Sequence, residues 1–311
     1  MQIYNKDHAF FHQLILIILT LLVALSGSAF LININNQIAL FLIITLTIGV
    51  FHGMLDIVLL KSAQFRFVKF LVVYASLATL ALLFFLYFPN GALFTLLLLA
   101  IWHFGEAQQS DDTFPVSAQS QLIFKRFLLG ASAIAATYFL ANQSLHQILN
   151  ILLLGSNWLS ITWILWRLIA YAWLLIFVVY LIQLISHKTL MLNCATLLEL
   201  IAVWLGFGLL PPLIAFSLYF GAYHAVRHIR DVLSQTGTIN KHKASLICIA
   251  LIALSILILV TFLLNNQLIL AGLYIDAPAI LLRSSIILLV VITLPHCLLI
   301  SIWRRNFHHN V

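Results

Sequence analysis

Long apolar runs, separated only by short polar breaks, constrain this chain more than any other feature of its sequence. Each run reaches about 20 residues, the length that an α-helix needs to cross the hydrocarbon core of a membrane. Of the 311 residues, 64% are hydrophobic and only 7% are charged, a balance that would make a soluble domain aggregate. We therefore expect an all-α, polytopic transmembrane helical bundle that forms a single integral membrane domain over residues 1–311.

The positions of the breaks predict about ten helices. Turn-type sequences such as Pro89–Gly91 and Pro211–Pro212 separate neighbouring runs. The stretch 144–156 is too short to span a membrane, so we expect a re-entrant or interfacial piece there. The predicted helices lie near residues 13–33, 37–60, 66–88, 91–108, 122–142, 157–186, 190–210, 212–234, 243–265 and 279–303.

The basic residues follow the positive-inside rule, which places Lys and Arg in cytoplasmic loops. The charged connections, from Lys6 near one end to Arg304 near the other, fall on one side, and only Arg167 and Arg283 depart from the pattern. No Lys or Arg occurs in the opposite loops, at residues 33–37, 89–91, 142–157 and 211–212. This predicts a multi-pass protein of the cell membrane with both termini cytoplasmic. The net charge of +7 is spread over these loops, so we expect no nucleic-acid partner.

Five histidines lie within the apolar runs. If the helices alternate as the charges indicate, His52, His103, His224 and His296 lie on helices that run in the same direction. At a rise of 1.5 Å per residue they are roughly 12–15 Å from the inner boundary, close to the midplane of a core about 30 Å thick. His228 lies one turn further in. Ionisable side chains at this depth are costly and usually functional.

The spacing of these histidines predicts a metal site. His224 and His228 are four residues apart, so both face one side of their helix. With His52 and His103 at matched depth, we expect the four rings to converge on one ion. Neutral imidazole suits iron, zinc, copper or nickel. A single membrane histidine can instead hydrogen-bond a neighbouring helix, and for His296 the two interpretations are equally good.

A carboxylate follows each of three histidines by three or four residues. Ligating histidines commonly donate their second N–H to a carboxylate, which fixes the tautomer and the ring orientation. The candidate supporting residues are therefore Asp56, Glu106 and Asp231, with His296 as a further one. Asp56 lies inside an apolar run, whereas Glu106 and Asp231 lie near predicted helix ends, where the alternative is a solvated or Arg-paired role.

Several catalytic signatures are absent from the sequence. It contains no HExxH motif of a membrane zinc protease and no GxSG motif of a membrane serine protease. The eight-histidine pattern of membrane di-iron desaturases is also missing. A bis-histidine haem protein is an alternative, although two haems would need histidine pairs at two depths.

Four short motifs appear in the order seen in one known family. They are HGMLD at residues 52–56, WHFGE at 102–106, HAVRH at 224–228 and PH at 295–296. The chain therefore resembles the Brp/Blh family of bacterial and archaeal membrane β-carotene 15,15′-dioxygenases. The resemblance extends from the second predicted helix to the last, although residues 110–210 carry no matching motif.

The resemblance implies that β-carotene in the lipid bilayer is cleaved with O2 at its central double bond to give two retinal molecules. By this analogy His52, His103, His224 and His228 would hold a non-haem Fe(2+). A retinal-binding rhodopsin is a candidate partner. Two alternatives remain: another iron oxygenase acting on a lipid or carotenoid, such as a hydroxylase, and a non-enzymatic haem- or metal-binding membrane protein.

Overall fold

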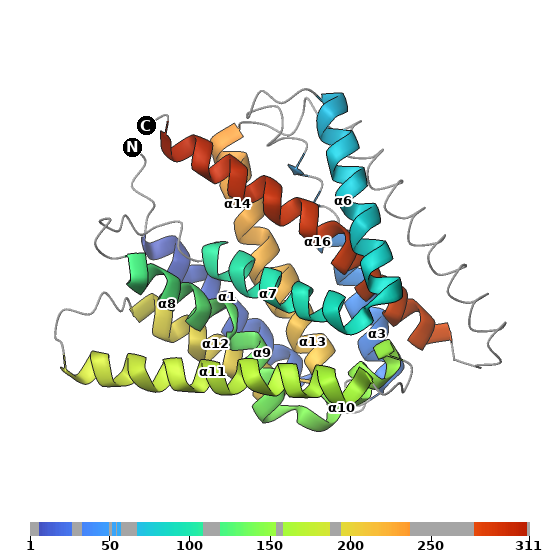
Figure 1. Ribbon diagram of the computed structural model, residues 1–311. Helices are drawn as coiled ribbons and strands as arrows, with labels where there is room; N and C mark the ends of the chain where they lie inside the picture. The colour runs from blue at the N-terminus through green and yellow to red at the C-terminus, as the bar shows by residue number, and fades with distance from the viewer. Residues whose placement is uncertain are drawn as a thin grey trace. The chain divides into compact units, whose positions relative to one another are not determined.

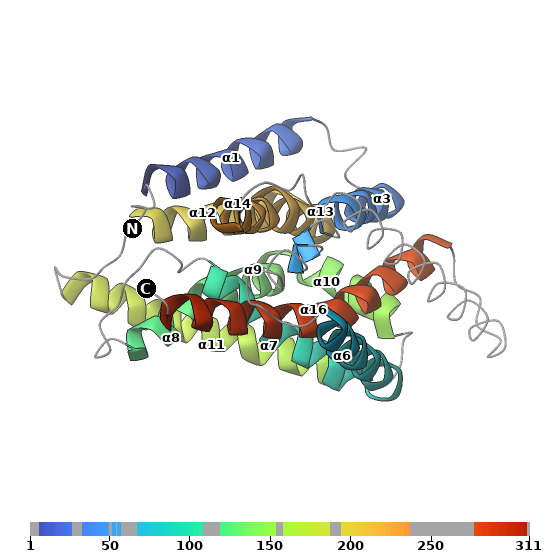
Figure 2. The same ribbon diagram turned by 90° about the horizontal axis from the view of Figure 1, so that it is seen from above.

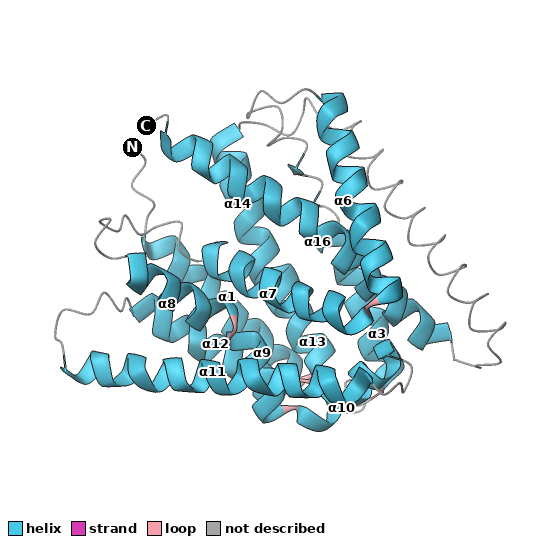
Figure 3. Cartoon of the chain, viewed as in Figure 1, coloured by secondary structure: helices cyan, strands magenta, loops and turns pink. Residues whose placement is uncertain are grey.

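The computed structural model describes residues 6–26, 33–49, 52–53, 55–56, 67–107, 119–153, 158–186, 194–236 and 277–309. These residues are almost entirely helical and contain no strand, as Figure 3 shows, so the predicted all-α fold is confirmed for them. The chain divides into two compact units, unit 1 (residues 1–37 and 97–224) and unit 2 (residues 38–96 and 225–311). A single membrane domain over the whole chain stays a prediction.

Unit 1 contains most of the helices that the structure describes. They are α1 (Lys6–Leu25), the second half of α7 (Pro89–Ala107), α8 (Gln119–Gly130), α9 (Ser132–Leu140), α10 (Asn142–Leu153), α11 (Trp158–Ser186), α12 (Cys194–Leu209), α13 (Pro212–Ser217) and the π-helical segment η3 (Leu218–Ala225). Helix α9 packs against both α11 and α12, and α1 lies along α12 (Figure 2). Most of residues 144–156, which we expected to be a re-entrant or interfacial piece, belongs to helix α10. The buried side chains of α10 are all leucine or isoleucine.

The helix predicted over 122–142 is broken into α8 and α9, which meet at Ala131 with a bend of 40°. The break follows Gly130, where an added Cβ would meet the carbonyl oxygen of Ile101 on α7. Close to the break, the Leu128 carbonyl accepts a hydrogen bond of 2.7 Å from the indole N–H of Trp173 on α11. The bend thus occurs where a neighbouring helix approaches closely and a side chain bonds the backbone.

Unit 2 contains most of α3 (Ile34–Ile44), the π-helical segment η1 (Thr45–Gly49), α6 (Phe67–Tyr87), the first half of α7, α14 (Val226–Thr236) and α16 (Ala277–His309). Helices α6 and α16 lie side by side (Figure 1). The helix predicted over 243–265 lies outside the described residues. Helix α16 continues through Pro295, the residue before His296.

Two predicted helices differ from the structure at their ends. The first was expected over 13–33, but α1 begins at Lys6 and ends at Leu25, because polar residues can extend a helix beyond its apolar run. The second was expected over 37–60, but regular helix ends at Ile44 and a π-helical turn follows. There the Thr47 hydroxyl donates a hydrogen bond of 2.6 Å to the Ile43 carbonyl, which competes with the regular ladder.

Three described helices are long and apolar enough to cross a membrane, and the bent pair α8–α9 would make a fourth as one broken span. The three are Val68–Tyr87, Leu159–Ile182 and Ala277–Ile302. In the most apolar part of α6 only 11% of the residues are buried, against 56% in that of α16. Helix α6 therefore presents most of its surface outward, while more than half of this part of α16 is buried. These helices fit a membrane protein; the multi-pass topology and the cytoplasmic termini stay predictions.

Candidate metal centre

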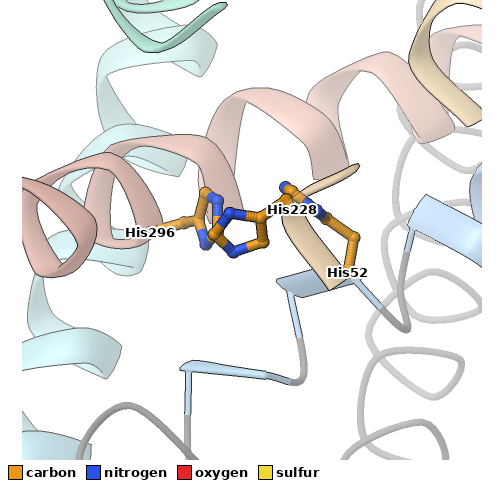
Figure 4. A group of neighbouring side chains, drawn as sticks. All are labelled: His52, His228 and His296. Carbon is orange, nitrogen blue, oxygen red and sulfur yellow. The ribbon is translucent and has the colours of Figure 1, made fainter. Parts of the chain in front are cut away.

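Unit 2 brings together three histidines from three separate segments. His52 follows η1, His228 lies on α14 and His296 lies on α16, and all three are buried. One ring nitrogen from each lies within 4.8 Å of the other two. Figure 4 shows the three rings turned toward one another. Residues 176 and 68 positions apart in the chain thus meet in one place, which makes the cluster a feature of the tertiary fold.

The geometry of this cluster suits a metal ion with nitrogen ligands. The His52 ring centroid lies 4.4 Å from that of His228 and 4.8 Å from that of His296. Ligand nitrogens about 2.1 Å from one ion are at most about 4.2 Å apart, so a contraction of roughly half an ångström brings even the widest pair into range. Ionisable side chains are costly to bury together and usually have a function when they are. Three neighbouring imidazoles can serve as ligands of one cation.

A hydrogen-bonded carboxylate supports this cluster. Asp56 Oδ1 lies 2.7 Å from His296 Nδ1, and the Tyr74 hydroxyl on α6 donates to Asp56 Oδ2 at 3.3 Å. Asp56 is 2% exposed, so a charge there depends on such partners. The sequence had placed Asp56 one turn after His52; the structure also joins it to a histidine 240 residues away.

A small apolar core lies directly beside the same residues. It consists of Leu55, Val232, Leu299 and Ile300, with Phe70 and Ile229 packed against it. Each functional side chain in unit 2 has a member of this core within one helical turn along the chain. Close packing of these neighbours fixes the backbone from which the histidines project.

Among the residues that the structure describes, two further buried histidines form a pair in unit 1. His103 on α7 and His224 on η3 approach with their Nε2 atoms 3.2 Å apart. Two nitrogens at this separation fit either a hydrogen bond between two neutral rings or two ligands of one ion. π-Helical segments are rare and occur often at functional sites, and here one carries His224.

Aromatic rings surround the pair in unit 1. The ring centroid of Phe104 lies 4.6 Å from that of His224, and Phe220 stacks on His224 at 6.0 Å with an interplanar angle of 17°. Tyr219 contacts Phe104 edge to face. The backbone next to His103 is held closely, because an added Cβ on Gly105 would meet the Arg126 backbone of α8. These rings make the surroundings of the pair largely apolar.

The predicted supporting residues have different positions in the structure. Asp56 and His296 form the pair described above. Glu106 is half-buried near the end of α7 in unit 1, and Asp231 lies on α14 with its side chain outside the described part of the chain. Tyr74 is a contributor that the sequence reasoning missed. The only signal for it was a hydroxyl within an apolar run, which is too common to single out.

A model of one protein family, β-carotene 15,15′-dioxygenase, matches residues 41–304. The chain belongs to the β-carotene 15,15′-dioxygenase family. The resemblance based on the four motifs is therefore confirmed, and the match contains the five histidines that are buried in the described part of the chain. Membership in the β-carotene 15,15′-dioxygenase family identifies the protein as a carotenoid-cleaving dioxygenase. No curated protein and no solved structure matches the chain.

Proposed function

We propose that this protein cleaves the 15,15′ double bond of β-carotene with O2 to form two molecules of retinal. One oxygen atom enters each aldehyde, so the reaction needs no separate reductant. The family match supports this reaction, and the buried cluster of His52, His228 and His296 is the observation that carries it. Buried imidazoles that can share an ion are what a dioxygenase with a metal cofactor requires.

The donor set fits ferrous iron, the cofactor that we propose. Its proposed ligands are His52, His103, His224 and His228. The proposed supporting residues are Asp56, Glu106, Asp231 and His296. Ferrous iron would supply the one-electron chemistry that ground-state O2 needs to react with a closed-shell alkene. Because two of the four ligands are described in each unit, the complete set rests on the sequence.

The protein's own part is to hold the imidazoles, exclude water and position the alkene. His52 is 4% exposed and His228 is 3% exposed, so little water reaches the rings. Water exclusion strengthens electrostatic interactions and prevents side reactions of a reactive site. The carboxylate of Asp56 holds one ring of the cluster in a fixed orientation.

The dimensions of the substrate suit a site inside the bilayer. A symmetric carotenoid is about as long as the hydrocarbon core is thick, so its central bond would lie near the midplane when the molecule spans the core. In the predicted topology the histidines lie near that level. We further propose that the protein is a multi-pass component of the cell membrane and that retinal leaves into the bilayer, where a retinal-binding rhodopsin would take it up.

Expression in a bacterial strain that accumulates β-carotene tests this function. The wild-type chain should bleach the yellow cells and produce retinal, and His52→Ala should abolish both effects. His146→Ala is the matched control, since His146 is an exposed histidine of α10 in unit 1. Cells that stay yellow with well-expressed wild-type protein would contradict the proposal.

Product analysis separates cleavage from the remaining alternatives. With ¹⁸O2, both aldehydes of half length should carry one label each, whereas a hydroxylase would yield labelled alcohols of full length. A Soret band in the purified protein would indicate haem and count against non-haem iron.

A further inference from the structure

Three polar side chains of unit 2 are connected in series by hydrogen bonds that end at the histidine cluster. The series begins at the Tyr74 hydroxyl on α6, passes through both oxygens of Asp56 and ends at Nδ1 of His296 on α16. Tyr74 is half-buried on a helix that otherwise presents mostly apolar side chains outward. Asp56 and His296 are buried. Polar groups are costly in an apolar interior unless they are hydrogen-bonded, and a hydrogen-bonded series of this kind holds its members in fixed orientations.

The direction of these hydrogen bonds determines which nitrogen of His296 is available to a cation. An ionised carboxylate only accepts, so with Asp56 in that form the 2.7 Å contact assigns the proton to Nδ1 of His296. In a neutral imidazole the lone pair is then on Nε2. The ring that holds this nitrogen lies 4.8 Å from His52 and 5.6 Å from His228, centroid to centroid. A histidine whose other nitrogen is held by a carboxylate has the arrangement commonly found around protein-bound metals.

We propose that His296 is a metal ligand through Nε2, binding the same ion as His52 and His228, and that Tyr74 is a positioning residue that acts on it through Asp56. The proposal rests on the metal site of the proposed function and deepens it, because it gives His296 a direct bond to the ion in place of the supporting role named there. The Tyr74 hydroxyl holds Oδ2, which leaves Oδ1 of Asp56 directed at His296. Removing the hydroxyl lets the carboxylate rotate, and the ring of His296 then loses its fixed orientation.

The first experiment removes one hydroxyl from each of two tyrosines in the full-length protein purified in detergent. The probe is cobalt(II), whose visible ligand-field bands report the number and arrangement of its ligands. Tyr74→Phe should weaken cobalt binding roughly three- to tenfold, less than the 10–100-fold typical of a directly bonded supporting residue, and should shift the bands. Tyr180→Phe is the matched control, because Tyr180 is buried on α11 and its hydroxyl has no hydrogen-bond partner among the described residues. Identical cobalt spectra and affinities for Tyr74→Phe and the wild type would overturn the role of Tyr74.

The second experiment tests His296 as a ligand. His296→Gly should weaken cobalt binding at least about tenfold and change the spectrum, and added imidazole should restore both by entering the space left by the ring. A purely structural role of His296 in joining α16 to Asp56 predicts normal cobalt bands without imidazole, and that result would overturn the ligand assignment.

Cobalt binding is measured without carotenoid or O2, so its outcome is separable from that of the cleavage reaction. Wild-type protein that binds cobalt through His296 but forms no retinal would contradict the proposed function and leave this inference in place. If wild-type protein forms retinal but His296→Gly keeps the native cobalt spectrum, the proposed function stands and the ligand role of His296 is contradicted.

Discussion

The two units surround their buried histidines in different ways. In unit 2 the cluster of His52, His228 and His296 has a carboxylate within hydrogen-bond distance and a polar chain behind it. In unit 1 the pair of His103 and His224 is packed among aromatic rings. Carboxylates orient imidazoles and favour a bound cation, whereas aromatic faces favour apolar contact. The contrast teaches that equally buried histidines can be supported by charge in one region and by packing in another.

The most severe test of this contrast compares His228→Ala with His224→Ala, two residues one helical turn apart in sequence. We expect each change to lower retinal formation by more than about 100-fold, because each removes a proposed iron ligand. Iron content of the purified variants, measured by mass spectrometry, should fall in both. Full iron content in His224→Ala would show that the pair in unit 1 has a role other than metal binding.

The carboxylates of the two units offer a second comparison. Asp56→Asn should weaken iron binding about 10–100-fold, because Asp56 bonds a histidine of the cluster directly. Glu106→Gln, which changes the proposed supporting carboxylate of unit 1, should weaken it by a smaller factor of about threefold, since Glu106 lies near the end of α7 and is only half-buried. Titration of the metal-free proteins with ferrous iron measures both. Equal losses in the two variants would remove the distinction between the units.

Glycines close to the histidines allow the packing of the two units to be compared through the stability of alanine variants. Gly105→Ala should destabilise the protein by about 1–3 kcal/mol, because the new Cβ would meet the Arg126 backbone. Gly53→Ala should change the stability by less than about 0.5 kcal/mol, since nothing lies within 4 Å of a Cβ there. Thermal unfolding in detergent compares the two. A stable Gly105→Ala variant would mean that α7 and α8 can separate without cost.

The smallest expected effect concerns how unit 1 is held together. Trp173→Phe should cost about 1 kcal/mol, because it leaves the Leu128 carbonyl without the indole N–H. Trp204→Phe keeps the aromatic packing and removes an N–H that has no hydrogen-bond partner within the described residues. It should therefore be neutral or slightly stabilising. A larger loss of stability for Trp204→Phe than for Trp173→Phe in the same unfolding measurement would contradict the stabilising role of the hydrogen bond from Trp173.

Much of the fold was predictable because apolar length and turn residues report local structure directly. The predicted break at residues 33–37 was right in place but too long, because α3 already begins at Ile34, where the Asn33 side chain caps it by accepting from the Asn35 backbone N–H at 2.9 Å. The bend at Ala131 was not predictable, because it depends on the approach of α7 to Gly130. Nothing in the local sequence distinguishes that glycine from one in an ordinary helix.

The sequence by itself determined the helical, membrane-suited character of this protein, its family, and the set of histidines from which a metal site can be built. These properties follow from hydrophobicity, helical spacing and the order of short motifs, all of which are local in the chain. Only the tertiary structure decided that His296 joins His52 and His228, that Asp56 bonds it, and that Tyr74 stands behind Asp56. Helix geometry sets partners three or four residues apart, but a contact across 240 residues exists only when separate helices pack together.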